Sequence, residues 1–195
     1  MEKTIVRKKV RKILQTITPE EIREKSALIS KTLLQSIWWR DAEIILAFCS
    51  MEKEVDTTEI IRAALGEAKI VGVPRIEGNY LIFHRIRDLE KGFSLDRFGI
   101  REPDPSWPVV DPSIMRSQKF LIVTPGLAFD RRKNRLGKGK GFYDRFLFQA
   151  RKCNAPNVLS IGVCFSEQLL ERIPVGDHDQ PVDGVITEKE MYMLW

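Results

Sequence analysis

Apolar residues recur at helical spacing in the first part of the chain. Between residues 2 and 16 they return every three or four positions, which predicts an amphipathic helix. The apolar positions of this helix are Val6, Val10, Ile13 and Leu14. A second helix is predicted from residue 18, because residues 18–21 combine a capping threonine, an early proline and the acid of a capping box. Residues 56–59 predict the start of a third helix, which ends near Gly66.

Short, strongly apolar runs predict strands between and after these helices. The predicted strands cover residues 44–49, 70–73, 80–86, 119–124, 158–165 and 184–187. Helices are expected at residues 142–152 and, for one short turn, at 167–172, whereas residues 88–117 are expected to be mostly irregular. Strands that alternate with helices predict an α/β sandwich with a mostly parallel sheet.

Composition narrows the class of protein. The 195 residues are 43% hydrophobic and 30% charged, which suits one globular domain spanning residues 1–195. Three cysteines without a CxxC pair argue against a disulfide framework or a structural zinc site, so we expect a cytoplasmic protein. Neither a signal peptide nor a membrane-spanning run is expected. The net charge of +5 favours an anionic partner without choosing one.

The segment from Arg135 to Arg145 carries the clearest chemical pattern. It follows a predicted strand and precedes a predicted helix, and in it Gly137, Gly139 and Gly141 alternate with two lysines. Glycines let backbone amides approach an anion, and a helix N-terminus adds unpaired N–H groups. The pattern therefore predicts a polyphosphate site, although neither the Walker A nor the GxGxxG fingerprint fits. A solvated basic hairpin and a contact to nucleic-acid backbone are the alternatives.

Carboxylates near this loop suggest a metal ion. Asp144 lies one turn into the predicted helix, where it could face magnesium held by phosphates. Asp177, Asp179 and Asp183 offer a second carboxylate, but by themselves they are more typical of a turn with caps than of a metal site.

Taken together, these residues resemble the 5-formyltetrahydrofolate cyclo-ligase family, also called methenyltetrahydrofolate synthetase. The stretches 125–130 and 135–144 match its signature nearly position for position, and weaker matches follow in order along almost the whole chain. The weaker matches are Lys3-x-x-x-Arg7 and residues 54–57, 73–75, 98–103, 178–179 and 182–187. The resemblance implies a three-layer α/β/α sandwich with a Rossmann-like sheet. It also implies that ATP phosphorylates the formyl oxygen of 5-formyltetrahydrofolate, after which N10 attacks and 5,10-methenyltetrahydrofolate, ADP and phosphate are released.

The resemblance also implies roles for individual residues. Catalytic positions are Arg135, Lys138, Lys140 and Asp144. ATP-binding positions are Lys3, Arg7, Arg135, Leu136, Gly137, Lys138, Gly139, Lys140, Gly141, Phe142 and Tyr143. Substrate-binding positions are Cys49, Glu54, Phe98 and Tyr143. The Mg²⁺-binding positions are Asp144 and Asp179. Without the resemblance, Lys3 and Arg7 would be interpreted as a solvated basic helix face. Glu54 would fit a charge at a helix start as well as a substrate-binding acid. Phe98 would fit a core residue as well as an aromatic that packs on the pterin.

The sequence and the resemblance also predict the partners of the protein and leave two alternative functions. We expect a monomer that acts on a small folate, and neither nucleic acid nor a membrane is expected as partner. The basic turn at residues 131–134 is predicted to attract a polyglutamate tail on the folate. A sugar-phosphate isomerase-like enzyme that binds an anion without using ATP is the main alternative, and a basic nucleic-acid-binding protein is the third.

Overall fold

The computed structural model describes residues 2–95 and 99–193. Its first helices are α1 (Lys3–Thr16), α2 (Pro19–Leu34) and the short α3 (Ile37–Asp41), which the sequence did not predict. The predicted capping box at α2 is confirmed: Thr18 accepts a hydrogen bond from the Glu21 amide, and the Glu21 carboxylate accepts one from the Thr18 amide. Such a cap stabilises a helix by about 1 kcal/mol.

Seven strands form the central sheet, in the order β12-β11-β9-β6-β1-β2-β3. They are β1 (Ile44–Ala47), β2 (Ile70–Glu77), β3 (Tyr80–Ile86), β6 (Phe120–Thr124), β9 (Val158–Val163), β11 (Gly184–Ile186) and β12 (Met191–Met193). The five inner strands are parallel, and the edge strands β3 and β12 are antiparallel to their neighbours. The predicted mostly parallel α/β sheet is confirmed.

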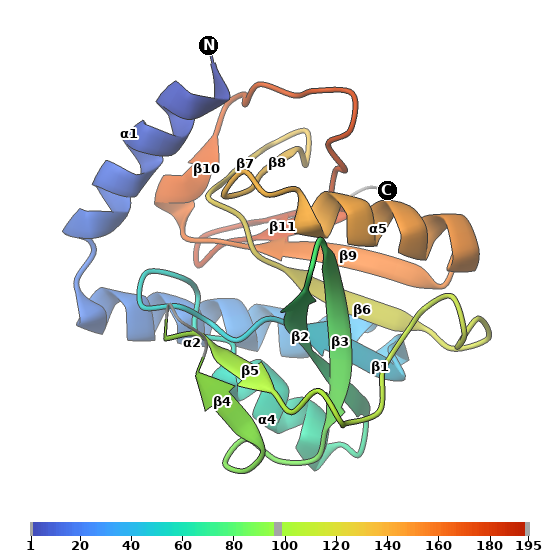
Figure 1. The fold of residues 1–195 in the computed structure, drawn as a ribbon. Coiled ribbons are helices and arrows are strands. Elements are labelled where there is room, and N and C mark those ends of the chain that lie inside the picture. Colours follow the sequence, from blue (N-terminus) through green and yellow to red (C-terminus); the bar gives the residue numbers. More distant parts are fainter. Residues whose placement is uncertain (1, 96–98, 194–195) are drawn as a thin grey trace.

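Alternate residues of the buried strands enter two separate cores. Ile45, Leu121 and Val123 pack with α1, α2 and α4 (Thr58–Gly66), whereas Ile44 and Ile122 pack with α5 (Phe142–Asn154). Figure 1 accordingly shows α5 on one face of the sheet and α2 with α4 on the other. This two-sided burial explains why the parallel strands are continuous apolar runs, and it gives the expected three layers.

Several short elements differ from the prediction. Residues 166–172 form a 3₁₀ turn (Ser166–Gln168) and the strand β10 (Leu169–Leu170) in place of a helix. β10 pairs with β7 (Ala128–Asp130), which pairs with β8 (Arg135–Leu136), inside what was expected to be a loop. The stretch expected to be irregular contains the hairpin β4 (Phe93–Leu95) and β5 (Arg101–Pro103). These strands have two or three residues each, too few for a period to show.

The order of the strands marks one end of the sheet as a ligand site. From β1 the chain passes through α4 to β2 on one side, and later returns to β6 on the other side of β1. In sheets of this kind ligands bind beyond the carboxyl ends of the strands where the order reverses. That point lies after Ala47 and Thr124, where β1 and β6 end side by side.

Candidate active site

A narrow hollow lies at this reversal point. It is lined by residues that follow β1, such as Phe48 and Glu54, by Pro125 and Gly126 after β6, and by Gln168. Its volume is about 10 Å³, roughly the room for one water molecule. Glu54 is the described site residue that lines this hollow, and we call the region around Glu54 the floor of the site.

The glycine loop enters α5 in a conformation suited to anions. Gly139 has φ +112° and Gly141, the N-cap of α5, has φ +68°, both values that L side chains rarely adopt. No side chain caps this helix end, so its first amides remain available as donors toward the loop. The loop thus combines free backbone donors with the positive end of a helix dipole.

The first helix reaches the same loop from far away in the sequence. The Arg7 Nε donates to the Gly137 carbonyl at 2.9 Å, and the Arg7 guanidinium lies against Gly139. Lys3, one turn earlier, pairs with Asp179. Arg7 therefore contacts the loop directly and Lys3 contacts Asp179, while their predicted contact with ATP stays a prediction.

Arg135 and Asp144 form a mostly buried ion pair beside the loop. The Arg135 Nη2 donates to the Asp144 Oδ1 at 2.7 Å, and the same oxygen accepts from the Gln180 amide at 3.1 Å. Asp179 directly precedes Gln180, so the two aspartates predicted to hold magnesium are close neighbours. Partial burial alone would raise the pKa of Asp179, but hydrogen bonds from Lys3 and the Gly176 amide lower it below its usual value.

Lys138 joins the loop to the turn after β1. Its Nζ lies 2.7 Å from the Glu54 Oε1 and 2.7 Å from the Met51 Sδ. The other Glu54 oxygen accepts from the Met51 amide at 2.9 Å. Lys140 is exposed and has no ion-pair partner within residues 2–95 and 99–193. The two loop lysines, which the sequence could not tell apart, therefore have different surroundings.

Two polar groups at the floor are buried without a partner. Among the described residues, nothing hydrogen-bonds the Tyr143 hydroxyl or the Arg135 Nε. Burial raises the pKa of Tyr143 well above its usual value, the charge of Glu54 adds to this, and Arg135 opposes it. Burial likewise raises the pKa of the Cys49 thiol to about 11, which the charge of Arg101 opposes. Cys49, Glu54 and Tyr143 thus share one poorly hydrated region.

One predicted residue stands apart from this group, and some neighbouring residues were not predicted. The Leu136 side chain packs in the hydrophobic core, so only its backbone could meet a nucleotide. Phe98 lies outside the described residues. Three groups that contact or influence the predicted site residues were not predicted from the sequence: Met51, Arg101 and the Gln180 amide. Only their positions offered a signal, since Met51 lies between Cys49 and Glu54, Arg101 lies in the matched stretch 98–103, and Gln180 follows Asp179.

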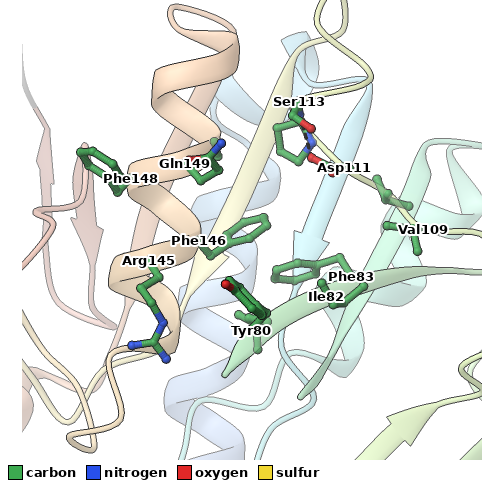
Figure 2. Close-up of a pocket in the computed structure, with 14 residues that line it drawn as sticks. Tyr80, Ile82, Phe83, Val109, Asp111, Ser113, Arg145, Phe146, Phe148 and Gln149 are labelled. Atoms are coloured by element: carbon green, nitrogen blue, oxygen red, sulfur yellow. Dashed lines mark hydrogen bonds between the residues drawn. The ribbon is translucent and has the colours of Figure 1, made fainter. Parts of the chain in front are cut away.

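A second, larger hollow lies away from these residues. It measures about 400 Å³ and runs between β3 and the side of α5, where Figure 2 shows Tyr80, Phe83 and Phe146 facing one another. Its lining is mainly apolar, and the Arg145 guanidinium at one end donates to the Asn79 carbonyl. We refer to it as the β3–α5 groove. None of the predicted site residues that the structure describes lines it.

No helix in the described part of the chain has the length and apolar character needed to cross a membrane.

The matching family model and the similar known proteins all point to one family. The model of the 5-formyltetrahydrofolate cyclo-ligase family matches residues 1–188. A 5-formyltetrahydrofolate cyclo-ligase of Mus musculus is 29% identical over 187 residues, which cover 94% of this chain and 92% of the mouse protein.

Solved structures agree with this match. The NMR structure of the Aquifex aeolicus 5,10-methenyltetrahydrofolate synthetase superposes with a TM-score of 0.82 at 33% identity, covering 99% of this chain and 93% of that one. A methenyltetrahydrofolate synthetase of Mycoplasma pneumoniae, at 19% identity, shares the fold with a TM-score of 0.72 over 96% of this chain and 99% of that one. The chain belongs to the 5-formyltetrahydrofolate cyclo-ligase family.

Proposed function

We propose that this protein converts 5-formyltetrahydrofolate to 5,10-methenyltetrahydrofolate with the consumption of magnesium-ATP. The observation that carries the proposal is the convergence of cations, carboxylates and uncapped amides at the N-terminus of α5, in a chain of this family. Its relatives from mouse and Aquifex aeolicus carry the names of this activity.

The residues around the glycine loop fit the phosphates of a nucleotide. Gly139 and Gly141 let the backbone bend so that amides can meet phosphate oxygens. Arg7 and Arg135 can offer guanidinium donors, and Lys140 is an exposed charge without a partner among the described residues. We assign these groups, with Lys3 and Lys138, to the nucleotide.

The carboxylates fit one magnesium ion. Magnesium in nucleotide sites usually takes one or two carboxylates and completes its shell with phosphate oxygens and water. Asp144 and Asp179 supply two carboxylates linked through Gln180. Within the described residues, no group of three or more His, Cys, Asp and Glu side chains is placed to hold a metal ion.

The floor of the site fits the folate. The Glu54 carboxylate can accept hydrogen bonds from the donors of a pterin ring. The Tyr143 hydroxyl has no partner among the described residues, and burial without one is unfavourable unless a ligand supplies it. Cys49 keeps its proton at neutral pH because its pKa is about 11, so we assign the thiol to packing and not to nucleophilic attack.

The chemistry asks for positioning and charge more than for covalent work by side chains. Bound magnesium-ATP supplies the phosphoryl group that turns the formyl oxygen into a leaving group. Arg135, Lys138 and Lys140 would neutralise the charge on the transferring group, and Glu54 would hold the folate in line with it. The charged side chains described around the loop offer no activated nucleophile, as this chemistry permits.

An omission assay tests the proposal. Purified protein is mixed with 5-formyltetrahydrofolate and magnesium-ATP, and the near-ultraviolet absorbance of methenyltetrahydrofolate is followed. We expect the absorbance to rise only when folate, ATP and magnesium are all present. A rise without ATP would favour the isomerase-like alternative, and no rise from folded protein would reject the proposal.

We also propose that a polyglutamate tail strengthens substrate binding through the basic turn 131–134. This turn joins β7 to β8 and carries Arg131, Arg132 and Lys133 directly before Arg135. The triglutamate form of the substrate should therefore bind more tightly than the monoglutamate, with a difference that shrinks as salt is added. Equal affinities would reject this part of the proposal.

A further inference from the structure

The charged residues of the site form ion pairs with one another. Lys3 pairs with Asp179, Arg135 with Asp144, and Lys138 with Glu54. In each pair, a cation assigned above to the nucleotide holds a carboxylate assigned to magnesium or to the folate. The charge of each cation is compensated by its carboxylate, so both partners turn fully to their ligands when binding exchanges the partners.

In two of the pairs, both the cation and the carboxylate gain a new partner of opposite charge when magnesium-ATP binds. When magnesium-ATP binds, Arg135 can turn to a phosphate while Asp144 turns to magnesium, and Lys3 and Asp179 can do the same. Neither side of these pairs is left without an opposite charge. Since leaving a mostly buried ion without a partner is costly, magnesium and ATP should enter together.

In the third pair, Lys138–Glu54, only the cation gains a new partner from magnesium-ATP. Lys138 can turn to a phosphate, but nothing in the nucleotide or the metal replaces it beside Glu54. The Glu54 side chain is only 17% exposed, and its remaining described contact is one hydrogen bond from the Met51 amide. A poorly hydrated carboxylate with too few donors is unfavourable, and a pterin ring could supply the missing ones.

We propose that Lys138 couples the two substrates: its transfer from Glu54 to the nucleotide frees Glu54 for the folate, so that each ligand raises the affinity for the other. This inference rests on the proposed function. It gives Lys138 a role that differs from that of Lys140, although both occupy one glycine-rich loop. Coupling of this kind is reciprocal and commonly amounts to about 5–150-fold in affinity.

The test is a pair of binding titrations on each of three proteins. The affinity for 5-formyltetrahydrofolate is measured by calorimetry with and without a saturating, non-hydrolysable magnesium-ATP analogue. In the wild type we expect the analogue to tighten folate binding at least about fivefold. In Lys138→Met the ratio should fall below about twofold, because Glu54 is free in both titrations. The matched control Lys140→Met should keep the wild-type ratio once the analogue is saturating.

Further variants and outcomes keep the test decisive. Glu54→Gln removes the other charge of the pair and should also lower the ratio, even if Lys138→Met does not fold. An unchanged folate affinity in the wild type, or a full ratio in Lys138→Met and Glu54→Gln, would overturn the coupling. Formylfolate-dependent ADP release from the same wild-type preparation distinguishes this failure from a failure of the proposed function.

Discussion

Helix α5 borders two contrasting regions. At its N-terminus the glycine loop brings paired charges together, and the nearby hollow beside Glu54 measures only about 10 Å³, whereas the side of the helix forms the β3–α5 groove, of about 400 Å³ and mainly apolar. Volume and apolar lining are the usual marks of a small-molecule site, and they would favour the groove. The chemistry favours the narrower region, because phosphoryl transfer needs fixed charges and donors.

The difference teaches that a polar site can be filled by its own side chains. The pairs Arg135–Asp144 and Lys138–Glu54 hold the charged side chains of this region against one another, and the hollow that Glu54 lines has little free volume. The β3–α5 groove, by contrast, keeps a larger open volume although its lining is mainly apolar. The convergence of ionisable groups is therefore the better guide to this site than the size of a hollow.

The largest effect is expected from Asp144→Asn. This change removes one of the two carboxylates proposed to hold magnesium and should lower turnover at limiting magnesium by about 100-fold, as losses of metal-site groups commonly do. Circular dichroism should show an intact fold, because asparagine can still accept the hydrogen bond from Arg135. The control in the groove is Phe148→Ser, which alters an exposed side chain and should change turnover less than about twofold. If Asp144→Asn turned over normally, or the groove variant did not, the contrast between the two regions would be wrong.

A smaller effect is expected from Lys140→Met. The loss of one charge-assisted hydrogen bond to phosphate costs about 2 kcal/mol, which corresponds to a roughly 30-fold loss in kcat/KM for ATP. The effect should appear in the KM for ATP or in kcat, whereas folate binding in the absence of nucleotide should stay the same. Steady-state kinetics with varied ATP measures it. Should neither parameter move, Lys140 has no role at the phosphates.

The rate at which Cys49 is alkylated tests whether the floor of the site is a poorly hydrated region. With a pKa of about 11, the thiol holds its proton at pH 8, so alkylation by iodoacetamide should be about 100-fold slower than for an exposed thiol. The rate should keep rising through pH 10, and bound folate should reduce it further. Peptide mass spectrometry gives the rate at this residue. A fast reaction that levels off below pH 9 would contradict a poorly hydrated floor.

The smallest effect is expected from Asp179→Asn on stability. The pKa of Asp179 is lowered in the folded protein, so its contribution is fully present above its unfolded pKa of about 3.9 and is lost as the pH falls through the lower folded value. Since the pair with Lys3 is partly exposed, the loss at pH 7 should be about 1 kcal/mol or less. Urea unfolding at pH 7 and below pH 3 should show a gap that closes in acid. A gap that stays constant with pH would leave the ion pair without a part in stability.

Much of the fold could be predicted because its signals are local. The capping box at residues 18–21 and the apolar run from Ile44 depend on neighbours in sequence, and both appear where expected. The hairpin of β7 and β8 could not be predicted, because strands of two or three residues show no period. The strand β10 could not be predicted either, since its two residues pair with the distant β7.

The site follows the same rule. The glycine loop and Asp144 form a local pattern, and their position at a helix N-terminus was predicted correctly. The partners of the charged groups could not be predicted, because Lys3 lies 176 residues from Asp179 and Lys138 lies 87 residues from Met51. The β3–α5 groove was missed for the same reason, as it joins residues 80–83, 109–113 and 145–150.

Hydrogen–deuterium exchange tests most directly that the nucleotide binds at the N-terminus of α5 and not in the groove. Exchange is followed by mass spectrometry in the intact protein, with and without a non-hydrolysable magnesium-ATP analogue. We predict slower exchange in peptides covering residues 3–7 and 137–144, and no change in residues 80–83 and 109–113. Protection of the groove segments with no change in the glycine loop would contradict the assignment of the site.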